Sequence, residues 1–173
     1  MNSTLAKIIR NAHQQLKYQQ LEDLASEVAE GVIVELGTYL GYGAIALCTG
    51  ASVSVYTVDD YQNRKGWAGE VYYPYDKKVF ISNRAIASVR PVLLEYDAQF
   101  AANNWHTDNV ELLVWDLGVP ARLCEDFEAW ERHITGKFVI HDTDDNRLGS
   151  DLLNPEGWNK YKDGVFWILE RKE

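Results

Sequence analysis

One segment, VIVELGTYLGYGAIAL at residues 32–47, constrains the fold of this chain more than any other. A continuous apolar run leads into a turn that contains Gly37, Gly41 and Gly43, and a helical pattern follows at once. A strand that is apolar on consecutive positions is buried on both faces, so helices must cover both faces of its sheet. The segment therefore predicts an α/β fold in which a ligand meets the glycine turn at the carboxyl end of a strand.

The rest of the chain alternates between strand and helix patterns. Strands are predicted at Val32–Leu36, Val53–Val58, Val92–Glu95, Val110–Trp115 and Lys137–His141. Helices are predicted at Tyr42–Thr49, Asp76–Val89, Asp97–Trp105 and Ala121–Thr135, the last of them ended by Gly136. Gly157–Tyr161 and Val165–Glu170, joined at Asp163-Gly164, predict a closing antiparallel hairpin. Together these elements predict a three-layer Rossmann-like fold with seven mostly parallel strands.

Residues 1–173 are expected to form a single domain, with residues 1–30 as an amino-terminal helical cap. The apolar spacing between Ser3 and Glu30 breaks after Leu16, which predicts two helices that meet near Gln19. Two long segments, Asp60–Tyr75 and Asp142–Glu156, have no clear regular pattern. The first carries an aromatic cluster and is expected to form a lid over the ligand. The cluster consists of Trp67, Tyr72, Tyr73 and Tyr75.

Charge and composition limit the partners. The formal net charge of -9 opposes binding of nucleic acid. No apolar run is long enough to span a bilayer, and the first residues lack the apolar core of a signal peptide. Cys48 and Cys124 form no CxxC pair and are interpreted as small core residues. We therefore expect a cytoplasmic protein, compatible with a homodimer, that acts on a small molecule.

The glycine spacing distinguishes between nucleotide ligands. The turn does not have the GxGxxG spacing of dinucleotide-binding proteins, which disfavours a nicotinamide-dependent oxidoreductase, and no GxxxxGK[ST] phosphate loop is present. Instead, the pattern Glu-Leu-Gly-Thr-Tyr-Leu-Gly-Tyr-Gly resembles the first motif of the class I S-adenosylmethionine-dependent methyltransferases. One departure is Gly43, where many members of that family carry serine.

The resemblance implies a set of contacts to S-adenosylmethionine. Glu35 would hold the methionine end, Asp59 or its neighbour Asp60 would accept hydrogen bonds from the ribose hydroxyls, and Asp97 would begin the adenine segment. From the residues alone, Asp97 is equally a helix cap. The alternative for Glu35 is a solvated acid at a strand end. The full predicted set is Glu35, Gly37, Thr38, Tyr39, Gly41, Gly43, Asp59, Asp60, Asp97, Ala98 and Gln99.

The same resemblance implies catalytic residues at the fourth and fifth strand ends. In the catechol O-methyltransferase-like branch, acids at these places bind a divalent metal that acidifies the acceptor hydroxyl. Asp116 and Asp142 resemble those ligands, with Mg²⁺ or Mn²⁺ as the expected ion. No lysine follows Asp116 where the catechol-type enzymes carry a basic residue, so His141 is the candidate base.

These features predict a methyltransferase that acts on a hydroxyl oxygen of a small molecule, with Asp116, His141 and Asp142 as its catalytic residues. The missing lysine leaves a second hypothesis, a binding module that keeps the fold without catalysis. His141 would then merely end a strand, and Asp142 would belong to a solvated loop.

Overall fold

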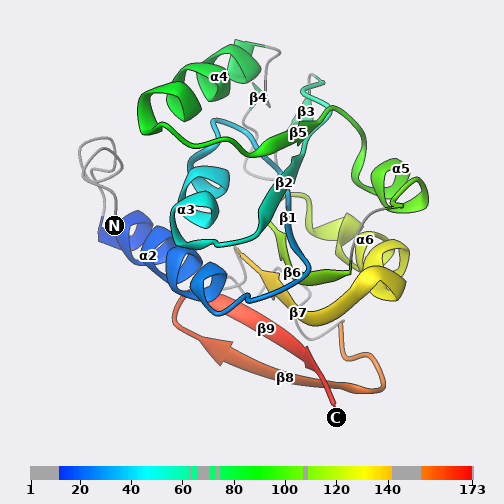
Figure 1. Ribbon diagram of the computed structural model, residues 1–173. Helices are drawn as coiled ribbons and strands as arrows, with labels where there is room; N and C mark the ends of the chain where they lie inside the picture. Colours follow the sequence, from blue (N-terminus) through cyan, green and yellow to red (C-terminus); the bar gives the residue numbers. More distant parts are fainter. Residues whose placement is uncertain are drawn as a thin grey trace.

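The computed structural model describes residues 12–62, 64–65, 71–72, 75–106, 109–141 and 153–172. Its main sheet has seven strands in the order β5-β2-β1-β6-β7-β9-β8 (Figure 1). The strands are β1 Val32–Leu36, β2 Ser54–Val58, β5 Val92–Leu94, β6 Val110–Trp115, β7 Ile134–Ile140, β8 Trp158–Asp163 and β9 Phe166–Arg171. The first five pair in parallel, and β9 pairs antiparallel with both β7 and β8. The predicted seven-stranded sheet and its closing hairpin are confirmed.

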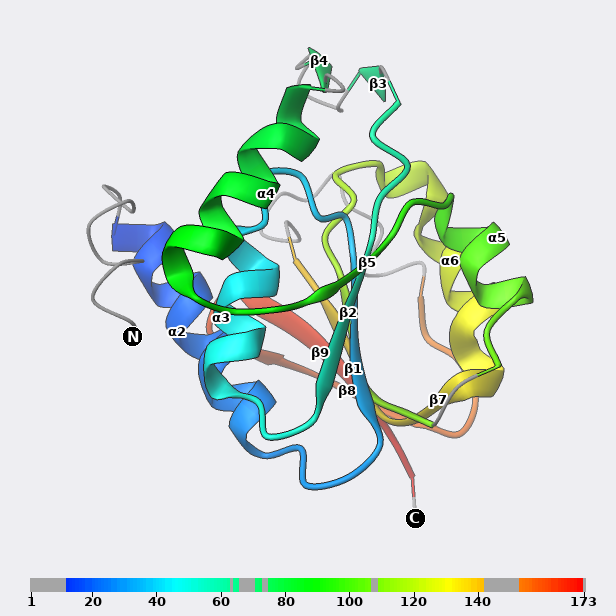
Figure 2. The same cartoon turned by 45° about the horizontal axis from the view of Figure 1, so that its top comes forward.

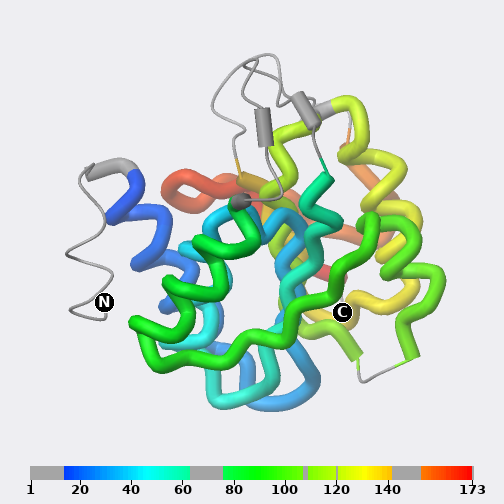
Figure 3. The backbone as a smooth tube through the Cα atoms, turned by 90° about the horizontal axis from the view of Figure 1, so that it is seen from above, coloured from blue at the N-terminus to red at the C-terminus, as the bar shows by residue number. Residues whose placement is uncertain are grey.

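Helices cover both faces of the sheet, as the apolar strands require. The helices are α2 Ala12–Ser26, α3 Tyr42–Gly50, α4 Tyr75–Ala87, α5 Ala98–Asn103 and α6 Leu123–Trp130, with 3-10 turns at Pro120–Arg122 and Glu131–His133. Figure 2 shows α2, α3 and α4 on one side of the sheet and α5 and α6 on the other, and the view from above in Figure 3 shows the same separation. Each face has its own apolar core. The three-layer prediction is therefore confirmed.

Helix α2 corrects the prediction at the amino terminus. It runs without interruption through Gln19, where a junction of two helices was predicted. The predicted break came from assigning Leu16 to the apolar face, but Leu16 is 50% exposed. The buried stripe instead contains Lys17, Leu21, Leu24 and Ala25. This spacing is regular for a helix, so no break is needed.

The segment Ala121–Thr135 is not one helix, because it holds α6 between two 3-10 turns and the start of β7. Helix α6 ends at Trp130, and β7 already begins at Ile134, which pairs with Val110 of β6. Gly136 therefore lies within a strand and does not end a helix. A Cβ at this glycine would meet the carbonyl oxygen of Glu111 on the neighbouring strand, so close packing explains the residue.

The two long segments are only partly described. Within Asp60–Tyr75, two short strands, β3 Arg64–Lys65 and β4 Val71–Tyr72, form a separate antiparallel pair, so part of this segment has regular structure that was not predicted. Trp67 and Tyr73 lie outside the described residues, as does most of Asp142–Glu156.

Cys48 and Cys124 are free thiols. Across the described ranges, no helix has both the length and the apolar character to cross a bilayer.

Candidate active site

A cavity of about 450 Å³ lies over the carboxyl ends of the central strands. The chain runs from β1 outward to β5 on one side and then returns to β6 on the other, so the strand order reverses between β1 and β6. Ligands of open α/β sheets bind at such a reversal. Of the eleven predicted cofactor contacts, all but Gly41 and Gln99 line the cavity, and so does Asp116. Helix α2 adds Gln14, Lys17 and Tyr18, none of which was predicted.

The glycine turn follows β1 closely and leads into α3. Gly37 and Gly41 have φ angles of 101° and 83°, a region that suits glycine. Gly41 is the N-cap residue of α3, and a Cβ there would meet the ring of Phe80. Gly41 therefore shapes the turn by packing against Phe80, and it does not line the cavity. Gly43 lies beside Glu35, because a Cβ at this glycine would meet Oε1 of that carboxyl group. The absence of a serine at this position leaves space for the acid.

Glu35 is a buried acid of the cavity wall. Only 1% of the residue is exposed, so the interpretation as a solvated strand-end acid is wrong. The Thr57 hydroxyl donates to its Oε2 at 2.6 Å, and the Thr38 hydroxyl oxygen lies 2.5 Å from that of Thr57. Burial raises the pKa of Glu35 to about 8, against the lowering effect of the Thr57 hydrogen bond. Glu35 is therefore mostly protonated at neutral pH in the absence of a ligand.

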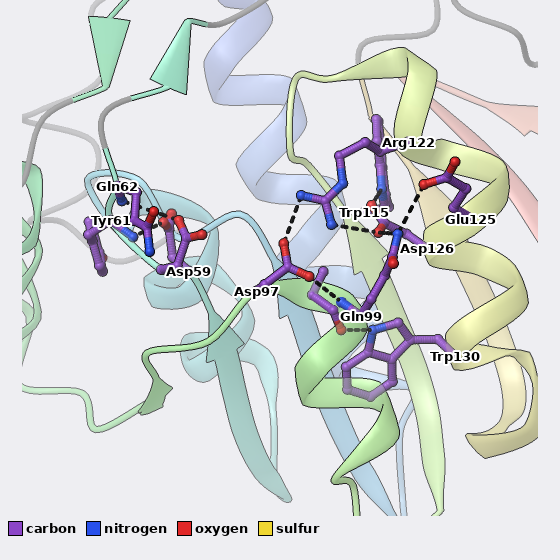
Figure 4. A network of polar contacts seen from close by, with 12 residues as sticks. Asp59, Tyr61, Gln62, Asp97, Gln99, Trp115, Arg122, Glu125, Asp126 and Trp130 are labelled. Atoms are coloured by element: carbon purple, nitrogen blue, oxygen red, sulfur yellow. Dashed lines mark hydrogen bonds and ion pairs between the residues drawn. The ribbon is translucent and has the colours of Figure 1, made fainter.

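Asp59 connects the two loops at the β2 end of the cavity. Its Oδ2 accepts the backbone N–H of Tyr39 at 2.9 Å, and its Oδ1 accepts that of Tyr61 at 2.8 Å. Both tyrosines have positive φ angles, so this carboxylate stabilises two unfavourable backbone conformations. Asp60 lies beside it and accepts the N–H of Gln62 at 3.2 Å. Figure 4 shows Asp59, Tyr61 and Gln62 apart from the network around Asp97.

Asp97 and Gln99 differ in their relation to the cavity. Asp97 caps α5 by accepting the N–H of Gln99 at 3.0 Å, and its Oδ2 pairs with Arg122 at 2.9 Å (Figure 4). It also lines the cavity, so the cap and the predicted ligand contact are compatible. The Gln99 side chain turns away toward α6, where it donates to Glu125 and to the buried Asp126. Gln99, predicted as a cofactor contact, is therefore not among the residues that line the cavity.

Asp116 and His141, two of the predicted catalytic residues, contact each other, and Lys17 joins them. Asp116 Oδ2 lies 2.6 Å from Lys17 Nζ, and its Oδ1 lies 2.8 Å from His141 Nδ1. Burial alone would raise the pKa of Asp116, but Lys17 and His141 hold it well below its usual range. No lysine follows Asp116 in the sequence, but α2 brings the buried Lys17 to this carboxylate. The place of Lys17 on the buried stripe with Leu21 was the one signal in the sequence.

The described residues at Asp116 do not fit a divalent ion. Both oxygens of this carboxylate already have partners, and a cation at Oδ2 would have to displace the Lys17 ammonium. Among the described residues, no three histidines, cysteines or acids are grouped to hold a metal. Asp142, the other predicted ligand, lies outside the described residues. No catalytic step is therefore assigned to a metal.

Comparison with known proteins bears on the fold. No protein-family model matches the sequence, and no curated protein matches it. Solved structures do match. The Bacillus cereus O-methyltransferase, in complex with S-adenosylhomocysteine, has a TM-score of 0.70 at 17% identity, over 99% of this chain and 92% of that one. The chain has the methyltransferase fold.

Two further methyltransferases support this assignment of the fold. TomG from Streptomyces achromogenes, an O-methyltransferase of tomaymycin synthesis in complex with S-adenosylmethionine, has a TM-score of 0.67 at 16% identity, over 99% of this chain and 90% of that one. The S-adenosylhomocysteine-bound methyltransferase of Podospora anserina has a TM-score of 0.74 at 11% identity, over 100% of this chain and 89% of that one. The methyltransferase fold thus accounts for nearly all of the chain.

Proposed function

We propose that the protein is an S-adenosylmethionine-dependent methyltransferase that acts on a hydroxyl oxygen of a small molecule. The cavity over the Glu35–Gly43 turn carries this proposal, because it brings acids from four strand ends around one volume at the topological switch. Its size falls within the range of about 300–1,000 Å³ that is usual for ligand sites. The structural neighbours that were solved with S-adenosylmethionine or its product support the choice of cofactor.

The residues around the cavity suggest how the cofactor is held. Asp59 and Asp60 are the candidates for the ribose hydroxyls, Asp97 and Ala98 for the adenine, and Glu35 for the methionine amino group. Gly37 and Gly43 line the cavity, and their missing Cβ atoms leave space for the Asp116 backbone and the Glu35 carboxyl group. When bound, S-adenosylmethionine supplies an electrophilic methyl group on its sulfonium. The carboxyl groups of the cavity wall suit S-adenosylmethionine, whose sulfonium and α-ammonium groups are both positively charged.

The Asp116 cluster is the proposed place for handling the acceptor proton. When Nδ1 of His141 donates to Asp116 Oδ1, the imidazole keeps its proton on Nδ1, and Nε2 is the basic nitrogen. Asp116 thus orients His141, as an acid orients a catalytic histidine in other enzymes. His141 lies next to the cavity-lining Asp116 and is not itself a lining residue; its Nε2 would accept the proton of an acceptor hydroxyl during methylation of that oxygen.

The test is methyl transfer from S-adenosylmethionine to a panel of catechols and sugars, followed by mass spectrometry. We expect transfer that survives chelation by EDTA and falls about 10²–10⁴-fold in His141→Asn, the usual contribution of a general base. Asp142→Asn tests the other predicted metal ligand. Loss of transfer both in this variant and in the wild type after chelation would restore the metal-assisted hypothesis. Cofactor binding without transfer to any acceptor would favour the non-catalytic binding module.

A further inference from the structure

The charged groups of the cavity wall are strongly unequal in sign. Of the lining residues that the structure describes, five are acids, namely Glu35, Asp59, Asp60, Asp97 and Asp116. Among the described lining residues, Lys17 is the single one with a positively charged side chain. An anionic group of a ligand in this cavity therefore has one full positive charge available from the described side chains.

Lys17 keeps donor capacity for such a group. Its ammonium has three N–H donors and no acceptor. Asp116 Oδ2 accepts one of them at 2.6 Å, and His141 Nδ1, at 3.2 Å, can take at most one more. When His141 donates from Nδ1 to Asp116, this nitrogen takes none. At least one donor of a side chain that lines the cavity thus remains for a ligand.

Lys17 also lies at a definite end of the cavity. Asp116, its partner, follows β6, and its backbone N–H donates to Leu36 at the end of β1 at 2.8 Å. Lys17 is close enough to Glu35 to lower the pKa of that acid electrostatically. The basic Lys17 and the acidic Glu35, whose ionised form a nearby cation favours, therefore both line the cavity beyond β1 and β6. The other acids follow β2 and β5, farther along the sheet order.

This arrangement matches the two charges of an α-amino acid. The structure assigns Lys17 as the residue that binds the carboxylate of the cofactor's amino-acid end, beside Glu35 at its amino group. The assignment rests on the proposed function. It implies that the β1–β6 end of the cavity recognises the amino acid and that the β2–β5 end recognises the nucleoside.

Two probes separate these ends. S-adenosylhomocysteine carries the amino acid, whereas 5′-methylthioadenosine keeps the nucleoside and lacks the amino acid. Calorimetry should show that Lys17→Met weakens S-adenosylhomocysteine binding about 10–100-fold, the loss expected for a charged hydrogen bond, and leaves 5′-methylthioadenosine binding within about twofold. Lys17→Arg should retain part of the affinity. Lys77→Met, which removes a lysine outside the cavity lining, is the control for overall charge.

The outcomes distinguish this assignment from the proposed function. Equal loss for both probes, or no loss for either, would overturn the assignment of Lys17. A wild-type protein that binds neither probe would overturn the proposed function as well. Because Lys17→Met leaves Asp116 buried without its cation, the double variant Lys17→Met/Asp116→Asn, which has no charge at either position, provides a second test. It should show the same selective loss for S-adenosylhomocysteine.

Discussion

Glu35 links the chemistry of the cavity to the stability of the fold. Its pKa rises from the ordinary value of 4.5 to about 8, because burial disfavours the charged form. Between these pH values the unfolded chain has released a proton that the folded chain keeps, so stability from this group is complete below about pH 4.5 and falls as pH rises toward 8. The slope is about 1.4 kcal/mol per pH unit.

Glu35→Gln should remove this slope, because the amide resembles the neutral acid and does not titrate. Urea unfolding of both proteins at pH 5 and pH 7.5 measures the difference. We expect the variant to gain stability relative to the wild type as pH rises. Asp116 does not contribute over this interval, since its lowered pKa keeps it ionised throughout. Parallel pH dependence in the two proteins would mean that Glu35 is ionised in the folded state.

Helix α2 brings Gln14, Lys17 and Tyr18 to the cavity, so its packing affects the site as well as the fold. Leu21 is fully buried against the α3 layer, whereas Leu16 on the same helix is 50% exposed. Leu21→Ala should therefore destabilise the fold by about 2–5 kcal/mol. It should also weaken S-adenosylhomocysteine binding, because α2 carries Lys17 and Tyr18 to the cavity. Leu16→Ala is the matched control and should change stability by less than about 0.5 kcal/mol. Urea unfolding checks both, and equal effects would contradict the helix register.

At the scale of the whole molecule, ligand binding should stabilise the native state by mass action. A ligand at 100 times its dissociation constant adds about 2.7 kcal/mol to the free energy of unfolding. S-adenosylmethionine and S-adenosylhomocysteine should therefore raise the melting temperature in a concentration-dependent way. NAD at equal concentration should not, because the turn does not have dinucleotide spacing. Differential scanning calorimetry measures the shift, and stabilisation by NAD alone would reverse the choice of cofactor.

Local sequence determined much of the fold and of the cavity floor. A buried strand, a glycine turn and a helix start are each encoded within a few residues, so Val32–Leu36 and the helix at Tyr42 were predicted with nearly the observed bounds. The acids at the strand ends followed from the same pattern. Asp59 and Asp97 lie in the cavity wall because parallel strands end on one edge of a sheet.

Only the tertiary structure decided which side chains complete the site. Lys17 contacts Asp116 although the two residues are 99 positions apart in the sequence, and no local sequence pattern predicts a contact over that separation. The same holds for Gly136, whose role depends on a neighbouring strand, and for the protonation of Glu35, which depends on burial by other elements. Periodicity shows which face of a helix is apolar, but long-range packing alone determines which charged groups share a buried volume.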